Sequence, residues 1–320
     1  MRLDDLGRRD SWEEVSAVVA GFGVSGFAAA DNLTHLGARV VALDEATSGE
    51  KAERAQLLEI LGADVRLGPG STATLPDGVD VVVTSPGWRP DAALLVQARE
   101  RGIPVWGEVE LAWRLRDPEH PAPWLVVTGT NGKTTTTSML HAMLVADGRR
   151  AALCGNIGRP VIDVLGTDDA ADFLAIELSS FQLYWAPSVR PVAGAVLNVA
   201  EDHLDWHGSM AGYAAAKAVA LSGRVAVAGI DDPTARDLLE QAPAPVKVGF
   251  TLDEPQPGQL GVSDGMLVDR AFADAAPLAH RELQCAKLPY DWEPPSGAHF
   301  GAPQQTSCKL SCRAACPKSR

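Results

Sequence analysis

The residues best suited to chemistry in this 320-residue chain are a lysine and a threonine that follow two glycines. They belong to the run Gly129-Thr130-Asn131-Gly132-Lys133-Thr134-Thr135, directly after an apolar segment. Glycine lets a backbone curl around an anion, lysine supplies positive charge, and a threonine hydroxyl can ligate Mg²⁺. The usual P-loop has another glycine where this chain has Val127, so the motif is a variant. The run predicts a phosphate loop for a nucleoside triphosphate, and a plain turn before a helix is the alternative.

Further candidate ligands follow other apolar segments. Glu177 ends a predicted buried strand, where a lone carboxylate is costly, so Mg²⁺ shared with Thr134 is one interpretation and a salt bridge the other. His203 lies among carboxylates and imidazoles and could ligate a metal, or lie in an exposed polar loop. Asn156 could border the site or belong to a plain turn. By sequence alone, Lys217 is expected on the surface of a helix.

A second glycine motif lies near the N-terminus. Gly21-x-Gly23-x-x-Gly26 follows an apolar strand, and Asp44 ends the next strand, as in a dinucleotide-binding fingerprint. An NAD-dependent oxidoreductase is one interpretation, but any ligand with a diphosphate and a ribose could use this geometry, and a structural glycine turn could also explain it. The turn from Ser85 to Gly87 follows another strand and is expected at the same edge of the sheet.

These motifs require strands and helices in alternation. In residues 1–107 we predict a Rossmann-like domain with a parallel sheet, its strands at 15–20, 39–43, 64–67, 79–84 and 103–106. In residues 108–278 we predict a P-loop ATPase-like α/β domain, with strands at 124–128, 150–153, 173–176, 192–197, 224–228 and 245–248 and a hairpin at 259–263 and 266–269. The segment 116–123 is rich in proline and marks the boundary between the two.

Composition excludes several classes of partner. The net charge of −13 disfavours nucleic acid and anionic membrane, because phosphate backbones reward clustered Lys and Arg. The N-terminus lacks an apolar signal core, and no apolar run reaches membrane-spanning length. Cys154 is the only cysteine in the first 278 residues, which fits a reducing compartment. We therefore expect a cytoplasmic monomer without nucleic-acid or membrane partners.

The last 42 residues differ from the rest of the chain. Residues 279–320 hold six Lys and Arg against three Asp and Glu, and four of the five cysteines. Their cysteines lack the C-x-x-C spacing of structural zinc sites, and no apolar period continues. We expect an irregular tail there, produced by a frameshift or an altered end, and an appended module is the alternative.

Five motifs in order carry a family resemblance. They are G-T-N-G-K-T, G-N-I-G, E-L-S-S-F-Q-L, N-x-x-E-D-H-L-D and A-A-A-K, spread across about 280 residues with the N-terminal G-F-G-V-S-G, S-P-G and G-E-V-E-L segments. This order resembles the Mur ligase family, and within it the member that adds D-glutamate. The resemblance implies that ATP phosphorylates the terminal carboxylate of UDP-MurNAc-L-Ala, and that the amine of D-glutamate attacks the acyl phosphate.

The same resemblance implies a role for each matching residue. Lys133 would hold the γ-phosphate, Thr134 and Glu177 one Mg²⁺, and His203 a second Mg²⁺, supported by Lys217 if it is carbamylated. The UDP-MurNAc-L-Ala substrate would contact Val24, Ser25, Asp44, Ser85, Gly87, Asn156 and Ser179.

One departure from the family is large. The H-N-x-x-N and D-S-K-A-T segments and the C-terminal ligase domain of the family are missing from this sequence. The chain as written is therefore expected to bind the UDP precursor while ligating poorly or not at all. A non-catalytic remnant that binds the precursor is the alternative, and the nicotinamide interpretation is disfavoured.

Overall fold

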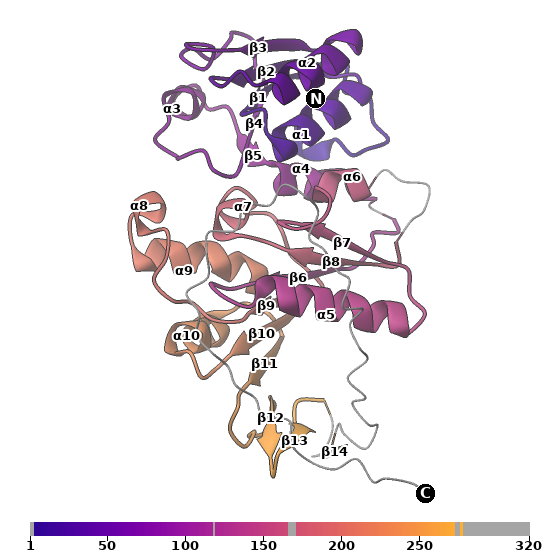
Figure 1. Cartoon of the computed structure of the whole chain (residues 1–320), viewed down its shortest axis with the longest axis vertical. Coiled ribbons are helices and arrows are strands. Elements are labelled where there is room, and N and C mark those ends of the chain that lie inside the picture. The colour runs from indigo at the N-terminus through magenta and orange to yellow at the C-terminus, as the bar shows by residue number, and fades with distance from the viewer. Residues whose placement is uncertain (1–2, 118, 166–170, 273–275, 278–320) are drawn as a thin grey trace, which may run out of the picture. The chain divides into compact units, whose positions relative to one another are not determined.

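The computed structural model describes residues 3–117, 119–165, 171–272 and 276–277, which form two α/β sheets with their helices (Figure 1). The first sheet is parallel throughout, in the order β3-β2-β1-β4-β5. Its strands are β1 (Ser16–Ala20), β2 (Arg39–Asp44), β3 (Asp64–Leu67), β4 (Val81–Thr84) and β5 (Val105–Gly107). The accompanying helices are η1 (Leu3–Asp5), α1 (Val24–His35), α2 (Gly49–Ile60) and α3 (Ala93–Glu100).

The strand order reverses between β1 and β4, which is where ligands bind in doubly wound sheets. The glycine turn after β1 and the turn after β4 therefore meet at one edge, where the Ser85 N–H donates to Ala20 O at 2.8 Å. Gly21 has a φ of +93°, and a Cβ on Gly26 would lie 1.9 Å from Gly21 O. Only glycine allows α1 to start this close to the strand.

The second sheet has the order β14-β13-β12-β11-β10-β9-β6-β8-β7 and is parallel from β7 to β12. Its strands are β6 (Trp124–Thr128), β7 (Ala151–Gly155), β8 (Phe173–Glu177), β9 (Ala193–Val196), β10 (Val225–Gly229), β11 (Val246–Phe250), β12 (Gln259–Ser263), β13 (Met266–Asp269) and β14 (Ala276–Pro277). The helices are α5 (Lys133–Ala146), α6 (Val161–Val164), α7 (Ser180–Tyr184), α8 (Leu204–His207), α9 (Met210–Ala218), η2 (Val219–Leu221) and α10 (Pro233–Gln241).

The predicted fold class is confirmed, and the antiparallel hairpin of β12 and β13 turns at Asp264 and Gly265, both with positive φ, as its Asp-Gly sequence favours. The division into domains 1–107 and 108–278 stays a prediction. The tail predicted for 279–320 lies outside the described residues.

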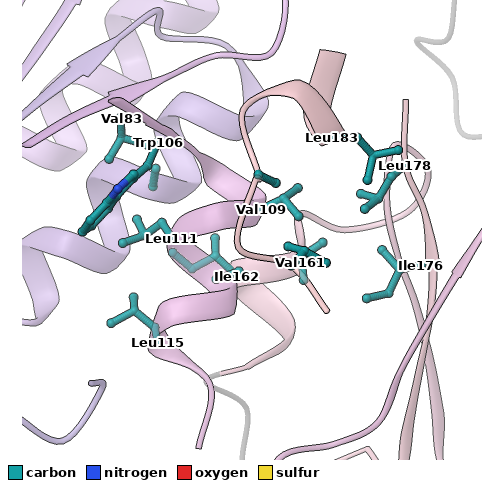
Figure 2. Close-up of a cluster of buried hydrophobic side chains, with 14 of the residues drawn as sticks. Val83, Trp106, Val109, Leu111, Leu115, Val161, Ile162, Ile176, Leu178 and Leu183 are labelled. Carbon is teal, nitrogen blue, oxygen red and sulfur yellow. The ribbon is translucent and has the colours of Figure 1, made fainter. Parts of the chain in front are cut away.

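A short helix, α4 (Glu108–Leu115), follows β5 and joins the two sheets through side-chain packing. Figure 2 shows Val109 and Leu111 of α4 beside Val161 and Ile162 of α6, and all four are fully buried. The same core cluster continues to Trp106 of β5 and to strand β8. Apolar residues on α4 therefore pack against elements of both sheets, which explains why the helix has little exposed surface.

Two carboxylates on α4 are buried in this junction. Glu108 is 2% exposed, and its Oε1 accepts from the Ile162 N–H at 2.8 Å, which caps the start of α6. Glu110 is fully buried and accepts from Arg114 Nε and from the Ser188 N–H, at 2.8 and 2.9 Å. Within the described part of the chain no cation pairs with Glu108 in this way, and burial raises the pKa of its carboxyl to about 7.

Trp185 provides a second junction. Its side chain is 8% exposed and belongs to a hydrophobic cluster whose other buried members, including Val18 and Leu95, come from the first sheet, from α3 and from the segment between β3 and β4. Its carbonyl accepts from the Gly107 N–H at 2.8 Å, and a Cβ at Gly107 would lie 2.9 Å from the Trp185 Cβ. The glycine is required here because the two backbones approach so closely.

Glu108→Gln should remove one contribution to the pH dependence of stability. The unfolded carboxyl ionises near 4.5 and the folded one near 7. Between these values the Glu108 carboxyl binds its proton more tightly in the folded chain, so its contribution to the free energy of unfolding falls as pH rises, by on the order of 3 kcal/mol. Urea unfolding at several pH values should show that the free energy of unfolding of the wild type falls relative to that of Glu108→Gln across this pH range, while the surface variant Glu14→Gln should follow the wild type. An equal slope in all three would contradict the assignment.

Candidate functional site

The glycine-lysine loop connects β6 to α5 and is held in place by Asn198, which follows the neighbouring strand β9. Asn198 O accepts from the Thr130 N–H at 3.0 Å, and its Oδ1 accepts from the Asn131 N–H at 2.9 Å. Its Nδ2 donates to Asn131 O at 3.2 Å. Gly129 and Gly132 have φ values of +157° and +81°. The loop is therefore fixed in shape by a residue to which the sequence assigned no role, although its place after a strand was a usable signal.

The start of α5 offers free donors. Among the described residues, the backbone N–H groups of Lys133, Thr134 and Thr135 have no acceptor, as is usual in the first turn of a helix. Lys133 Nζ donates to Thr130 O at 2.9 Å, so its charge stays at the mouth of the loop. Amides, helix dipole and ammonium together favour an anion such as a phosphate.

Glu177 ends β8, next to β6 in the sheet, and is 1% exposed. Its Oε1 accepts from Asn156 Nδ2 at 2.9 Å, but its buried Oε2 has no hydrogen-bond partner among the described residues. An unsatisfied carboxylate oxygen is costly to bury, and a hard divalent cation is the partner that such an oxygen prefers. The donor set therefore fits Mg²⁺, with the Thr134 hydroxyl at the nearby start of α5.

Backbone geometry holds Asn156 against Glu177. The Asn156 N–H donates to Glu177 O at 2.7 Å. Gly155 has a φ of +103°, and a Cβ there would lie 2.2 Å from the same carbonyl. The turn after β7 therefore requires glycine, and it places the exposed Asn156 beside Glu177.

The expectation from sequence alone that Lys217 lies on a helix surface is wrong. Lys217 is 1% exposed, and its Nζ donates to Gly129 O at 2.8 Å. The ammonium lies over the Tyr213 ring, 4.5 Å from the centroid. Burial, and then the charge of Lys133, lower the pKa of Lys217 to about 7. Helical periodicity could not show this, because the covering loop comes from a distant part of the chain.

His203 adopts a left-handed backbone, with a φ of 51°, at the start of α8. Such a conformation is uncommon for a residue with a side chain and is often found at functional sites. Its ring packs 4.7 Å from that of Phe181, and its Nε2 lies 3.4 Å from Asp202 Oδ2. The side chain is about half exposed, at 47%, so it remains accessible to a ligand.

His207 is a further residue that sequence reasoning left without a role. Its ring stacks on Phe181 with an interplanar angle of 12°, and its Nε2 lies 3.0 Å from Ser180 Oγ. Burial, followed by the nearby His203 and Lys217, lowers the pKa of His207 to about 4. The imidazole is therefore neutral at physiological pH.

Among the residues expected at the first sheet, Asp44 is engaged within the protein. Its Oδ2 accepts from the Phe22 N–H at 2.6 Å and from Lys51 Nζ at 2.7 Å. Burial alone would raise the pKa of Asp44, but these hydrogen bonds and the charge of Lys51 hold it below its usual value. Asp44 thus fixes the glycine turn after β1 as well as standing at a strand end.

The other first-sheet residues lie at the same edge. Ser85 Oγ donates to Gly21 O at 3.1 Å, and Gly87 O accepts from Trp206 Nε1 at 3.2 Å. Val24 and Ser25 begin α1, and Val24 is 59% exposed. The hydrogen bond from Trp206 means that the first-sheet turn touches the segment that carries His203 and His207.

Ser179 performs a local structural task. It caps α7 in a reciprocal arrangement with Gln182, whose N–H donates to Ser179 Oγ at 3.2 Å while the Ser179 N–H donates to Gln182 Oε1 at 3.0 Å. Ser179 Oγ also donates to Gln182 Oε1, at 3.1 Å. A capping serine of this kind satisfies the free amides of a helix start. Its hydroxyl proton is therefore already used in this structure.

Comparison with known proteins finds a similarity to one family. Residues 127–259 match the Mur ligase middle domain. The chain is 56% identical over 267 residues to the UDP-N-acetylmuramoylalanine--D-glutamate ligase of Mycolicibacterium vanbaalenii, a match that covers 82% of this chain and 54% of the relative. It is 68% identical over 197 residues to the enzyme of the same name from Mycobacterium avium, which covers 61% of this chain and 40% of the relative. The chain thus spans about half the length of these curated relatives.

A solved structure supports the fold. The chain resembles the UDP-N-acetylmuramate:L-alanyl-gamma-D-glutamyl-meso-diaminopimelate ligase of Neisseria meningitides with a TM-score of 0.50 at 19% identity. That match covers 80% of this chain and 85% of the other. Within the described residues, no helix is long and apolar enough to cross a bilayer.

Lys217 should lose its proton near pH 7, because burial and Lys133 lower its pKa to about 7. NMR titration of ¹³C-labelled lysine side chains should show one signal with this midpoint, and Lys217→Met should remove it. Since the unfolded lysine keeps its proton to about 10.5, the free energy of unfolding should also rise with pH between the two values. A Lys217→Met variant with the same rise would contradict this.

Proposed function

Because the chain belongs to the Mur ligase family, we propose that it binds ATP and the UDP-linked precursor of a ligase that joins D-glutamate to UDP-N-acetylmuramoyl-L-alanine. The reaction would form an amide bond in peptidoglycan precursor synthesis, through an acyl phosphate. The observation that carries this proposal is the phosphate loop at Lys133 beside the buried, half-satisfied carboxylate of Glu177. We also propose that the protein is a monomer and lies in the cytoplasm, as the sequence predicts.

In this proposal the loop residues from Gly129 to Thr135 hold the triphosphate. The free N–H groups at the start of α5 donate to phosphate oxygens, and Lys133 moves from Thr130 O to the γ-phosphate. Thr134 and Glu177 would hold one Mg²⁺. Bound there, the ion would neutralise phosphate oxygens so that two anions can approach each other.

A second Mg²⁺ would be held by His203 together with a carbamylated Lys217. The lysine suits this modification because a large fraction of a group with a pKa of about 7 is uncharged at neutral pH. The neutral Nζ lone pair can attack CO₂, forming a nitrogen-carbon bond and releasing a proton. The product carries a negative charge, which would end the repulsion between Lys217 and Lys133.

The precursor would span both sheets. Its diphosphate would meet the glycine turn after β1 and the start of α1 at Val24 and Ser25, a site typical of doubly wound sheets. Asp44, Ser85 and Gly87 would border the uridine ribose and diphosphate at the same edge. Further along, Asn156 and Ser179 would border the muramoyl group, and release of Ser179 from Gln182 would accompany that contact.

Lys133→Ala should abolish ATP binding while leaving the affinity for UDP-MurNAc-L-Ala unchanged, because the lysine lies at the phosphate loop and not at the first sheet. Isothermal titration calorimetry with each ligand in the presence of Mg²⁺ measures both. The effect on ATP should exceed tenfold, as expected for loss of a charged hydrogen bond worth about 1.5 to 3 kcal/mol.

Lys247→Ala, at an exposed position on β11, is the matched control and should bind both ligands like the wild type. Unchanged ATP affinity in Lys133→Ala would contradict the site assignment. The titrations use ATP and UDP-MurNAc-L-Ala without D-glutamate, so they test the nucleotide site independently of D-glutamate binding.

A further inference from the structure

Tyr213 lies on α9 under the phosphate loop and is 1% exposed. Its hydroxyl oxygen is 3.1 Å from Thr130 Oγ1. Thr130 Oγ1 also accepts from the Ala200 N–H at 3.0 Å and donates to Ala200 O at 3.2 Å. A hydroxyl has a single proton, and Thr130 uses its proton on Ala200 O, so Tyr213 is the donor to Thr130.

The ring of the same tyrosine supports Lys217, one helical turn further along α9. Lys217 Nζ lies 4.5 Å from the ring centroid and donates to Gly129 O at 2.8 Å. A cation over an aromatic face is attracted by the ring, and the attraction is strongest away from water. Tyr213 therefore contacts the loop directly through its hydroxyl and indirectly through Lys217.

The contacts of Tyr213 and Lys217 are with Thr130 and Gly129, the first two residues of the loop. Thr130 connects them to Lys133. Thr130 O is the acceptor for Lys133 Nζ at 2.9 Å. A rotation of Thr130 would move this carbonyl and with it the resting position of Lys133. A phenylalanine could fill the same buried space, so the hydroxyl is present for its bond to the loop, because a buried phenol needs a partner.

We propose that Tyr213 is a positioning residue of the nucleotide site, whose hydroxyl fixes Thr130 and whose ring fixes Lys217, so that the loop is held ready for the triphosphate. This inference rests on the proposed function of the loop. It assigns no contact between Tyr213 and the nucleotide, and the effect of the residue passes through Thr130.

Tyr213→Phe tests the hydroxyl alone, since it keeps the ring under Lys217. Calorimetric titration with Mg-ATP should show an affinity roughly three- to tenfold weaker than that of the wild type, the range expected for one lost hydrogen bond. Thr130→Val should weaken binding at least as much, because it also removes the two hydrogen bonds to Ala200. The double variant should be no weaker than the weaker single variant, because both changes remove the same bond.

Two controls separate positioning from general damage to the fold. Tyr184→Phe removes a phenol that is 41% exposed and should bind Mg-ATP like the wild type. Affinity of Tyr213→Phe for UDP-MurNAc-L-Ala should be unchanged, and the lysine signal with a midpoint near 7 should persist. A folding defect would instead change all three measurements together.

If the wild type binds Mg-ATP, either of two outcomes would overturn this inference and leave the proposed function standing. They are wild-type affinity in Tyr213→Phe, and losses in the two single variants that add up in the double variant. Failure of the wild-type chain to bind Mg-ATP would overturn the proposed function and this inference together.

Discussion

The candidate site depends on charges that the fold has removed from water. Glu177 and Lys217 are each 1% exposed, one at the end of β8 and the other on α9. Among the described residues their partners are neutral groups: Glu177 accepts a hydrogen bond from an amide, and Lys217 donates to a carbonyl and lies over an aromatic ring. Such groups cost stability, and a protein tolerates them where a ligand later completes their environment. The phosphate loop keeps Lys217 in this state through the Gly129 carbonyl, and Asn156 after β7 holds Glu177.

The regular elements were largely predictable, and for a clear reason. Parallel strands buried on both faces are continuous apolar runs, and each is followed by glycine or a small polar residue where the chain turns. The phosphate loop and the Asp264-Gly265 hairpin follow from local conformational demands of glycine. Helices of four or five residues, such as α6 and α8, were beyond this reasoning because they have too few turns to show a period.

The contacts within the site were harder to predict, because they join distant segments. The burial of Lys217 arises from a loop 88 residues away, and a lysine beside three alanines gives no local hint of it. Ser179 and Gln182 form a helix cap, which the sequence shows as a serine followed three residues later by a glutamine. The family resemblance predicted only a substrate contact for Ser179. The partners of Asn198 and Tyr213 lie in the distant phosphate loop, so they could be identified only from the arrangement of strands and helices.

Trp185 has a consequence for the order in which the protein is made. Its side chain completes a hydrophobic cluster whose other buried members come before residue 99, on the first sheet, on α3 and in the segment between β3 and β4. A ribosome releases those residues first, so this apolar face must wait, open to water, until residue 185 has emerged. Chaperones bind exposed surfaces of this kind. The first sheet is therefore expected to reach its final packing only after much of the second has been synthesised, although its own strands are contiguous in sequence.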